Sequence, residues 1–181
     1  MFGFAFLIDM ILDAIDYKLL EVLQQNARMT QMEMASAVGL SQPAVAERMR
    51  KLEQEGIIRG YAARVNARKL GKDISAFIGV SIEHPRYNAG FAKKILALPD
   101  VLECHRVTGS DSYLLKVVTE NTESLDRLIS DLLRVIPGVT RTLTSIVTSS
   151  IKEGSHITPA ATLEKDARQR PKGLKTRRKR H

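Results

Sequence analysis

The residues best able to do chemistry in this chain of 181 residues are its lysines and arginines, which gather in two segments. The chain holds 28 Lys and Arg against 20 Asp and Glu, a net charge of +8. Residues 41–72 carry +5 and residues 152–181 carry +7, whereas residues 1–40 sum to −3 and residues 73–151 to −1. Cationic bands beside a near-neutral body bind polyanions, so this pattern predicts a nucleic-acid partner ahead of a membrane surface.

The other reactive residue types form no recognisable site. The single cysteine, Cys104, excludes an internal disulfide and a cysteine-rich metal site, which favours a reducing cytosol and a buried apolar role for the thiol. The four histidines show no metal-ligand spacing, so we expect no metal. His105, Ser110 and Asp111 lie close in sequence, but such residues are common in turns and strands, and a hydrolytic triad is the weaker alternative.

Three helices are predicted over residues 12–56, and they position the first cationic segment. Apolar residues recur at helical spacing in the first helix, and Thr30 and Glu33 form a capping box before a short second one. Ser41 caps a third helix, which Gly56 ends. Two helices joined by a tight turn and held against a preceding helix form a helix-turn-helix, with an ordinary three-helix bundle as the alternative.

The third helix is the candidate recognition helix, because it buries one apolar stripe. With Val45, Met49 and Leu52 inward, the helix is expected to turn outward Pro43, Ala44, Glu47, Arg50 and Lys51, and to place at the borders Gln42, Ala46 and Arg48. Gln42 suits an adenine edge, and Arg50 or Arg48 suits guanine or phosphate. The alternative is a solvated surface on which these arginines pair with Glu47 or Glu53. The predicted DNA-binding set, including one residue of the second helix, is Gln31, Ser41, Gln42, Pro43, Ala44, Ala46, Glu47, Arg48, Arg50 and Lys51. Residues 57–65, centred on Gly60, are expected to form a wing or connecting strand.

Beyond residue 72 the apolar pattern changes from helical spacing to alternation, which predicts strands. The predicted order is strand 74–82, helix 91–98, strands 101–107 and 113–119 joined by a turn, a helix from 121 or 122 that Pro137-Gly138 ends, and strand 139–149. The second of these helices is expected to present one apolar face, formed by Leu125, Leu128, Ile129, Leu132 and Leu133. This order is that of ferredoxin-like sandwiches. Apolar residues on both faces of these strands would leave a large exposed patch, so we expect two copies to pair sheet to sheet.

Both chain ends fall outside these two units. Residues 1–11 are apolar but lack a basic region and are shorter than a bilayer span, so we expect neither a secretion signal nor a membrane helix. Met10 is an alternative start of the natural protein. Residues 152–181 lack apolar periodicity and are rich in Lys and Arg, which predicts a disordered basic tail that either contacts phosphates or only solvates the chain.

Five motifs occur in order between residues 12 and 151: Leu12-Asp13-Ala14-Ile15-Asp16, Val38-Gly39-Leu40-Ser41, Arg48-Met49-Arg50-Lys51-Leu52-Glu53, Gly56-Ile57-Ile58-Arg59-Gly60-Tyr61, and Val107-Thr108-Gly109 before a Tyr-Leu-Leu strand. Together they resemble the Lrp/AsnC (feast/famine) family of transcription regulators. The resemblance implies an α+β protein with an N-terminal winged helix-turn-helix followed by a ferredoxin-like βαββαβ sandwich, a ligand-sensing domain of the RAM type. The expected domains are residues 12–60 for DNA binding, 61–72 as a linking strand or hinge, and 73–151 for dimerisation and effector binding.

The family also implies dimers that often build octamers, DNA binding near promoters, and an amino acid or related small molecule as effector. The candidate effector loop is the turn of Thr108, Gly109, Ser110, Asp111 and Ser112. Gly109 lets the backbone approach a ligand, successive amides can hold a carboxylate, and Asp111 can answer an ammonium group. Without the resemblance these residues are simply a hairpin turn. Many relatives carry an acid where this chain has Ser112.

The sequence therefore predicts a cytoplasmic, nucleoid-associated transcriptional regulator that binds specific double-stranded DNA sites as a homodimer or higher oligomer, and that is not an enzyme. It is expected to respond to an amino acid and to need no cofactor. Two alternatives stay open: an architectural DNA-binding protein of low specificity and, less favoured, an enzyme on a ferredoxin-like sandwich.

Overall fold

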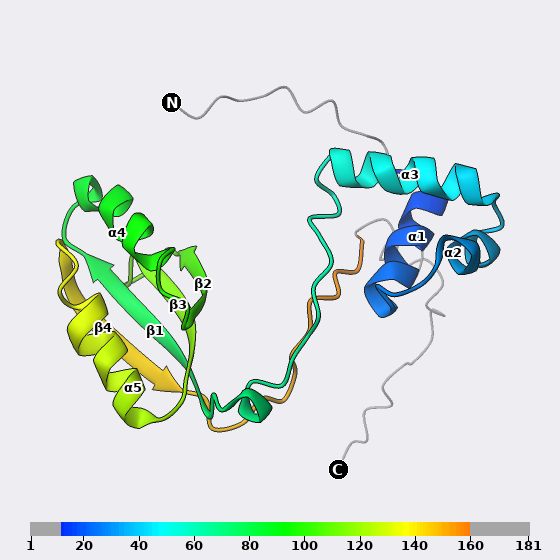
Figure 1. Ribbon diagram of the computed structural model, residues 1–181. Coiled ribbons are helices and arrows are strands. Elements are labelled where there is room, and N and C mark those ends of the chain that lie inside the picture. Colours follow the sequence, from blue (N-terminus) through cyan, green and yellow to red (C-terminus); the bar gives the residue numbers. More distant parts are fainter. Residues whose placement is uncertain (1–11, 160–181) are drawn as a thin grey trace, which may run out of the picture. The chain divides into compact units, whose positions relative to one another are not determined.

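The computed structural model describes residues 12–159, which form two compact units (Figure 1). The helical unit comprises the residues up to Ala62 together with those from Gly154, and the sandwich unit comprises Ala63–Glu153. The apolar residues 1–11, including Met10, and residues 160–181 of the basic tail lie outside the described residues. Within residues 12–159, no helix combines the length and the apolar character that crossing a membrane requires.

Three helices build the helical unit, as predicted: α1 (Ala14–Gln25), α2 (Gln31–Val38) and α3 (Gln42–Gln54). Each contributes one apolar stripe to a common core, because apolar residues three and four apart lie on the same side of a helix. Leu19, Val45 and Leu52 are fully buried in that core. The stripe of α3 fixes which of its residues face outward.

The ends of the helices confirm most of the predicted caps. Thr30 and Glu33 form the predicted capping box at the start of α2, and Asp13 and Asp16 form another at the start of α1. Ser41 occupies the position before α3, but its side chain makes no cap hydrogen bond, so that predicted cap is wrong. The second residue of α3 is proline, which lacks one of the amide hydrogens that a cap side chain usually binds.

The segment after α3 contains no strand. The amides of Ile57 and Ile58 donate to the Leu52 carbonyl and close the helix end. The next residues stay irregular up to a 3₁₀ turn at Arg68–Leu70. The strand expected over 57–65 is therefore not formed within this chain, whereas the linking strand or hinge over 61–72 stays a prediction. A strand needs a hydrogen-bonded neighbour, and in the described part of the chain no other strand pairs with this segment.

The sandwich unit has the predicted element order: β1 (Ile74–Ile82), α4 (Asn88–Ile95), β2 (Val101–Arg106), β3 (Tyr113–Thr119), α5 (Thr122–Arg127) and β4 (Val139–Ile146). The strands form one antiparallel sheet in the order β2-β3-β1-β4, which confirms the ferredoxin-like arrangement. After α5 the chain continues as a π-helical stretch, Leu128–Leu133, in which the Arg134 amide donates to the Ile129 carbonyl. This wider winding leaves Leu132 exposed instead of facing the core as predicted.

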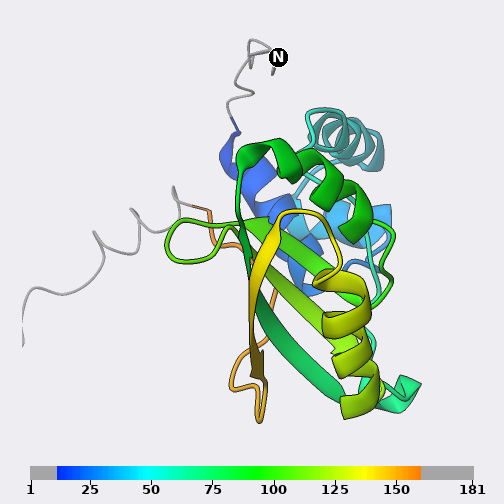
Figure 2. The same cartoon turned by 90° about the vertical axis from the view of Figure 1, so that its left-hand side faces the viewer.

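Helices α4 and α5 cover one face of the sheet (Figures 1 and 2). Alternate residues of β1 and β3 point into this layer, where Ile78, Leu115 and Phe91 are fully buried. The other face, called the open sheet face below, is formed by the intervening residues of the four strands: Phe77, Gly79, Ser81, Glu103, His105, Leu114, Lys116, Arg141, Leu143 and Ser145. Phe77, Leu114 and Leu143 are exposed there, as the predicted sheet-to-sheet pairing requires.

Cys104 corrects one expectation from the sequence. It lies on the edge strand β2 and is exposed instead of buried, because β2 has a hydrogen-bonded neighbour on one side only. Partial desolvation nevertheless raises the pKa of its thiol.

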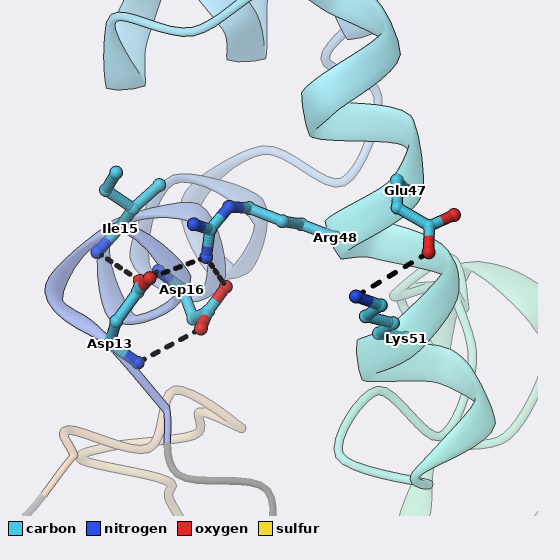
Figure 3. A network of polar contacts seen from close by, with 6 residues as sticks. All are labelled: Asp13, Ile15, Asp16, Glu47, Arg48 and Lys51. Atoms are coloured by element: carbon cyan, nitrogen blue, oxygen red, sulfur yellow. Dashed lines mark hydrogen bonds and ion pairs between the residues drawn. The ribbon is translucent and has the colours of Figure 1, made fainter.

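A salt bridge joins α3 to α1 (Figure 3). Arg48 Nη1 lies 2.8 Å from Asp13 Oδ2 and 2.7 Å from Asp16 Oδ1, and Asp16 is buried. The hydrogen bond from the Asp16 amide lowers the pKa of Asp13, and the Arg48 guanidinium lowers it further. The hydrogen bonds that the Arg48 guanidinium donates to the carboxylates, the one to Asp16 having the larger effect and the one to Asp13 the next, raise the pKa of Arg48. One guanidinium therefore sets the orientation of α3 on α1.

Substituting Arg48→Ala should lower the free energy of unfolding by about 1–3 kcal/mol, because the buried Asp16 loses its cationic partner. Folding lowers the pKa of Asp13, so its ionised carboxylate stabilises the folded protein at pH values above the ordinary pKa of 3.8. This stabilisation is lost as the pH falls through the pKa that Asp13 has in the folded protein. The difference in the free energy of unfolding between the wild type and Arg48→Ala should therefore shrink below about pH 4. Urea unfolding from pH 7 to pH 3 measures it, with Arg59→Ala as control, and equal stability of both variants at pH 7 would contradict the role of Arg48.

Candidate DNA interface and effector loop

The outer side of α3 is the candidate DNA interface. The apolar stripe of α3 faces the core of the helical unit, so the residues on the opposite side of the helix point to solvent, while Arg48 at the border of the stripe reaches α1. Most of the predicted residues are exposed, but Ala44, expected to face outward, is half-buried, and Gln42, expected at the border, is exposed. The exposed members of the predicted set are Gln31, Ser41, Gln42, Pro43, Glu47, Arg50 and Lys51, and the half-buried ones are Ala44, Ala46 and Arg48.

Arg50 carries the most organised polar contacts on this surface. Its Nε and Nη2 donate to the two carboxylate oxygens of Glu47, at 3.0 and 2.7 Å, and its Nη1 donates to Gln54 Oε1 at 2.6 Å. Lys51 Nζ lies 3.7 Å from the same carboxylate. The hydrogen bond from Arg50 lowers the pKa of Glu47. The Arg50 guanidinium is thus exposed and held in a two-pronged geometry that matches a phosphate or a guanine edge.

Arg48 differs from Arg50 although both were predicted to contact DNA. Its guanidinium is bound by the acids of α1 and by neither of the partners considered from the sequence, Glu47 and Glu53. Glu53 instead accepts a hydrogen bond of 2.8 Å from the Tyr61 hydroxyl. Desolvation, together with this bond, raises the pKa of Tyr61 to about 12. Tyr61 belongs to the motif at residues 56–61, but its contact with Glu53, eight residues earlier, was not predicted from the sequence.

Three residues at the start of α2 and α3 keep their side chains available. Gln31, Ser41 and Gln42 are exposed, and within residues 12–159 their side chains make no hydrogen bonds. Because the amino-terminal end of a recognition helix approaches base edges, an unengaged hydroxyl and amide at this end are suited to contacts with DNA.

The candidate effector loop joins β2 to β3 as the predicted hairpin. The Val107 amide donates to the Ser112 carbonyl at 3.2 Å across the turn. Thr108, Gly109 and Ser110 are exposed, whereas Asp111 and Ser112 are half-buried. Gly109 has φ +121°, a conformation that residues with a side chain rarely adopt.

Asp111 already has a cationic partner. Its Oδ1 accepts from Arg141 Nη2 at 3.0 Å and from Ser81 Oγ at 3.3 Å. The carboxylate lies over Gly79 of β1, where a Cβ atom would overlap it. Arg141 was missed from the sequence, since it stands 30 residues from Asp111 and only the register of β1 with β4 brings it close.

Ser112 ties the loop to the end of β1. Its amide donates to the Val80 carbonyl at 2.9 Å, and its hydroxyl accepts from the Ile82 amide at 3.0 Å. The register of β1 with β4 shifts between Ser81 and Ile82. Ser112 therefore fixes the loop on the sheet, and the exposed residues 108–110 remain open to a ligand.

The residues of the alternative triad are not joined to one another. His105 Nε2 lies 3.0 Å from Glu103 Oε2, and Glu103 also pairs with Lys116 at 3.2 Å. The His105 hydrogen bond, followed by that of Lys116, lowers the pKa of Glu103. Asp111 is bound elsewhere, and no group of three His, Cys, Asp or Glu residues within 12–159 is arranged to hold a metal ion.

Two family models match the chain. A model described as a winged helix-turn-helix DNA-binding domain covers residues 12–59, and the Lrp/AsnC ligand binding domain covers residues 75–157. The chain is 36% identical over 148 residues to the leucine-responsive regulatory protein of Rhizobium meliloti, covering 81% of this chain and 95% of that protein. It is 44% identical over 118 residues to YezC of Bacillus subtilis, an uncharacterized HTH-type transcriptional regulator, covering 65% of this chain and 83% of YezC.

Solved structures show the same architecture. The transcriptional regulator NMB0573 of Neisseria meningitidis, in complex with L-Met, matches with a TM-score of 0.79 and 33% identity, over 84% of this chain and 99% of that chain. AsnC of Escherichia coli matches with a TM-score of 0.76 and 29% identity, over 82% of this chain and 99% of that chain. Both the sequence motifs and the fold agree with these relatives, whose family consists of transcriptional regulators, not enzymes. The chain belongs to the Lrp/AsnC family of transcriptional regulators.

Proposed function

We propose that the protein is a homodimeric regulator that reads specific double-stranded DNA through the outer side of α3 and answers an amino acid at the loop Thr108–Ser112. The observation that carries the DNA contact is the exposed Arg50, held in a two-pronged geometry beside the unengaged Gln42 and Ser41. The proposed site of action is chromosomal DNA in the cytoplasm.

Within this interface Arg48 and Arg50 have different roles. Arg50 exchanges Glu47 for a phosphate or a guanine edge, whereas Arg48 orients α3 by holding α1. Lys51, exposed next to Arg50, adds affinity for phosphate. Glu47 adds selectivity, because only DNA that displaces its carboxylate from Arg50 can bind. Gln31, at the exposed start of α2, lies where the first helix of such a pair meets the backbone.

Substituting Arg50→Ala should weaken binding of a specific duplex by about 1–3 kcal/mol if Arg50 reads guanine, and weaken all duplexes equally if it binds phosphate. Gel-shift titrations at a fixed salt concentration, with the preferred duplex and single-base variants, measure this. Arg127→Ala, an exposed arginine of α5, serves as control. Unchanged affinity of Arg50→Ala for every duplex would remove this residue from the interface.

We propose the open sheet face as the surface on which two copies pair, and the family resemblance implies that such dimers assemble further, as in octamers. Phe77, Leu114 and Leu143 expose apolar surface on this face, 41%, 36% and 56% respectively. A two-fold axis would bring each of these residues against the same patch of the partner and present two reading heads to a palindromic site.

Substituting Phe77→Asp should raise the dissociation constant of the dimer roughly 100-fold or more, because a two-fold interface loses the burial of two phenylalanines. Light scattering across a dilution series measures it. Leu96→Asp is the matched control, since Leu96 is 89% exposed and follows α4 in the layer on the opposite face. If Leu96→Asp dissociates the dimer and Phe77→Asp does not, the proposed interface is wrong and the dimer forms through the helical layer instead.

We propose an α-amino acid as effector because the loop combines exposed amides with an acid and a base. The amides of Gly109 and Ser110 can receive the ligand carboxylate, and Asp111 can receive the ammonium group. Asp111 is already paired with Arg141, so the ligand's ammonium group would compete with Arg141 for Asp111. A zwitterion can do this because its carboxylate would in turn be within reach of Arg141 as well as of the loop amides. A ligand that favours one assembly state of the protein would then shift the DNA-bound population.

Calorimetry against the twenty amino acids should show heat for at least one of them, and Gly109→Leu should weaken that binding at least ten-fold, since a leucine side chain strains the turn and covers the amides. Gly154→Leu, outside the loop, is the control. If none of the twenty amino acids gives a heat of binding, the proposed effector is wrong and the protein is a regulator without an amino-acid effector.

A low-specificity architectural protein is the second candidate, favoured by the second cationic segment at residues 152–181. Genome-wide occupancy separates the two: a specific regulator gives few sharp peaks, and an architectural protein gives broad coverage.

A further inference from the structure

The positive charge near α3 lies in the chain that follows the helix and not in the helix itself. Residues 41–55 hold three basic and three acidic residues, so they carry no net charge. Residues 56–72, called the exit segment below, hold five basic residues and no acid, and the whole surplus of +5 belongs to them. Because Lys and Arg bind duplex DNA by releasing counterions from phosphates, the exit segment is better suited than α3 to supply that affinity.

The basic residues of α3 are also already engaged. Arg48 is bound by the acids of α1, and Arg50 and Lys51 share the carboxylate of Glu47. Each of them must give up a carboxylate before it can bind a phosphate, so the broken ion pair offsets part of the gain. Affinity for the DNA backbone is supplied more effectively by a cation that has no such partner.

Three basic residues of the exit segment make no side-chain hydrogen bond or ion pair within residues 12–159. These three, all of them exposed, are Arg59, Arg68 and Lys69. The other two have partners in the sandwich unit: Arg64 Nη2 donates to the Glu153 carbonyl at 3.2 Å, and Lys72 Nζ lies 2.8 Å from Asp100 Oδ1. The unpaired cations are therefore the candidates for contacts with phosphate.

Of these three, Arg59 alone lies in the helical unit, and the chain on both sides of it is held by the last turn of α3. The Ile58 amide donates to the Leu52 carbonyl at 3.0 Å, and the Ile58 side chain packs against the core of the helical unit. Two residues beyond Arg59, the Tyr61 hydroxyl donates to Glu53 Oε1 at 2.8 Å. Arg59 thus has a fixed place relative to α3.

The contact between Tyr61 and Glu53 needs a turn of the chain and a protonated hydroxyl. Gly60 supplies the turn, with φ +144°, a conformation that residues with a side chain rarely adopt. Desolvation, together with the bond to Glu53, raises the pKa of Tyr61 to about 12, so the hydroxyl remains a donor at physiological pH. One oxygen of Glu53 is thereby directed to Tyr61 and not to Arg59.

The carboxyl end of α3 is expected beside a phosphate strand of the duplex. The helix has 13 residues and is about 20 Å long, whereas the major groove is about 12 Å wide. A helix whose amino-terminal end approaches base edges therefore extends past the groove, and its other end lies near the backbone. The carboxyl end of a helix carries a partial negative charge, so a phosphate there needs a cation such as Arg59.

We infer that Arg59 binds a backbone phosphate at the carboxyl end of α3, and that Tyr61 and Glu53 are the residues that position it. The inference rests on the proposed DNA binding through α3. A phosphate contact adds affinity and fixes the register of the helix on the duplex without reading bases. Arg50 at the middle of α3 and Arg59 beyond its end would then hold the duplex at two separate places.

The phosphate contact is tested by DNA titrations of the full chain at several salt concentrations. Arg59→Ala should flatten the log–log dependence of affinity on salt by about 0.9 for each protomer bound, the value for one phosphate contact. It should also weaken the preferred duplex and its single-base variants by the same factor, because phosphates carry no sequence information. Arg68→Ala is the matched control, since it removes the same charge from the exit segment outside the helical unit, and it should change the slope less than half as much.

The positioning role is tested by a double-mutant cycle of Tyr61→Phe and Arg59→Ala. Loss of the Tyr61 hydroxyl should weaken DNA binding about three-fold in the otherwise native chain, as expected for one hydrogen bond. The same change should leave the affinity of the Arg59→Ala protein unchanged, because no guanidinium is left to position. Tyr17→Phe is the control, since within residues 12–159 the Tyr17 hydroxyl of α1 makes no hydrogen bond.

The outcomes distinguish this inference from the proposed function. Wild-type protein that ignores duplex DNA at low salt would defeat the proposed function itself. Intact DNA binding with a native salt slope in Arg59→Ala would overturn the phosphate contact alone. An equal loss of slope in Arg68→Ala would also overturn it, since the place of the charge relative to α3 would then not matter. A Tyr61→Phe effect of equal size with and without Arg59 would overturn the positioning role.

Discussion

The salt bridge between Arg48 and the two acids of α1 is the interaction on which the proposed reading surface depends. The apolar stripe of α3 fixes which side of the helix is inward, but a stripe alone permits rotation and sliding on α1. Arg48, at the border of that stripe, pins the helix at one place, because Asp13 and Asp16 are themselves fixed by their capping box. The exposed positions of α3 keep a defined direction as a result.

This arrangement gives different contacts to two arginines that are two residues apart. Arg48 is bound across helices and Arg50 is bound along its own helix, to Glu47 and Gln54. An inter-helix bridge to a buried acid is costly to break, whereas an exposed intrahelical pair exchanges readily with solvent or ligand. Composition alone gives both residues the same cationic character, yet their surroundings make Arg48 structural and leave Arg50 exposed for the proposed contact with DNA.

The sequence predicted those features that local rules govern. Alternation of period two placed β1 and β3 at their observed bounds, and the Thr30–Glu33 capping box marked the start of α2. Contacts between distant residues carry no local signal: Arg48 lies 32 residues from Asp16, and Arg141 lies 30 residues from Asp111. The failures also have local causes, since Pro43 removes a donor for the Ser41 cap and the π-helical winding after α5 turns Leu132 outward.

The pairing of Arg50 with Glu47 has a consequence for kinetics. In the proposed complex, a guanidinium already held by the acceptor oxygens of Glu47 and Gln54 would meet DNA in a narrow set of rotamers, so that encounter would need an exchange of acceptors and not a search through side-chain conformations. In that complex Glu47 would compete with DNA for the same guanidinium and so favour release. The proposed reading helix would then suit rapid sampling of many sequences, and a long residence time would depend on contacts made elsewhere in the complex.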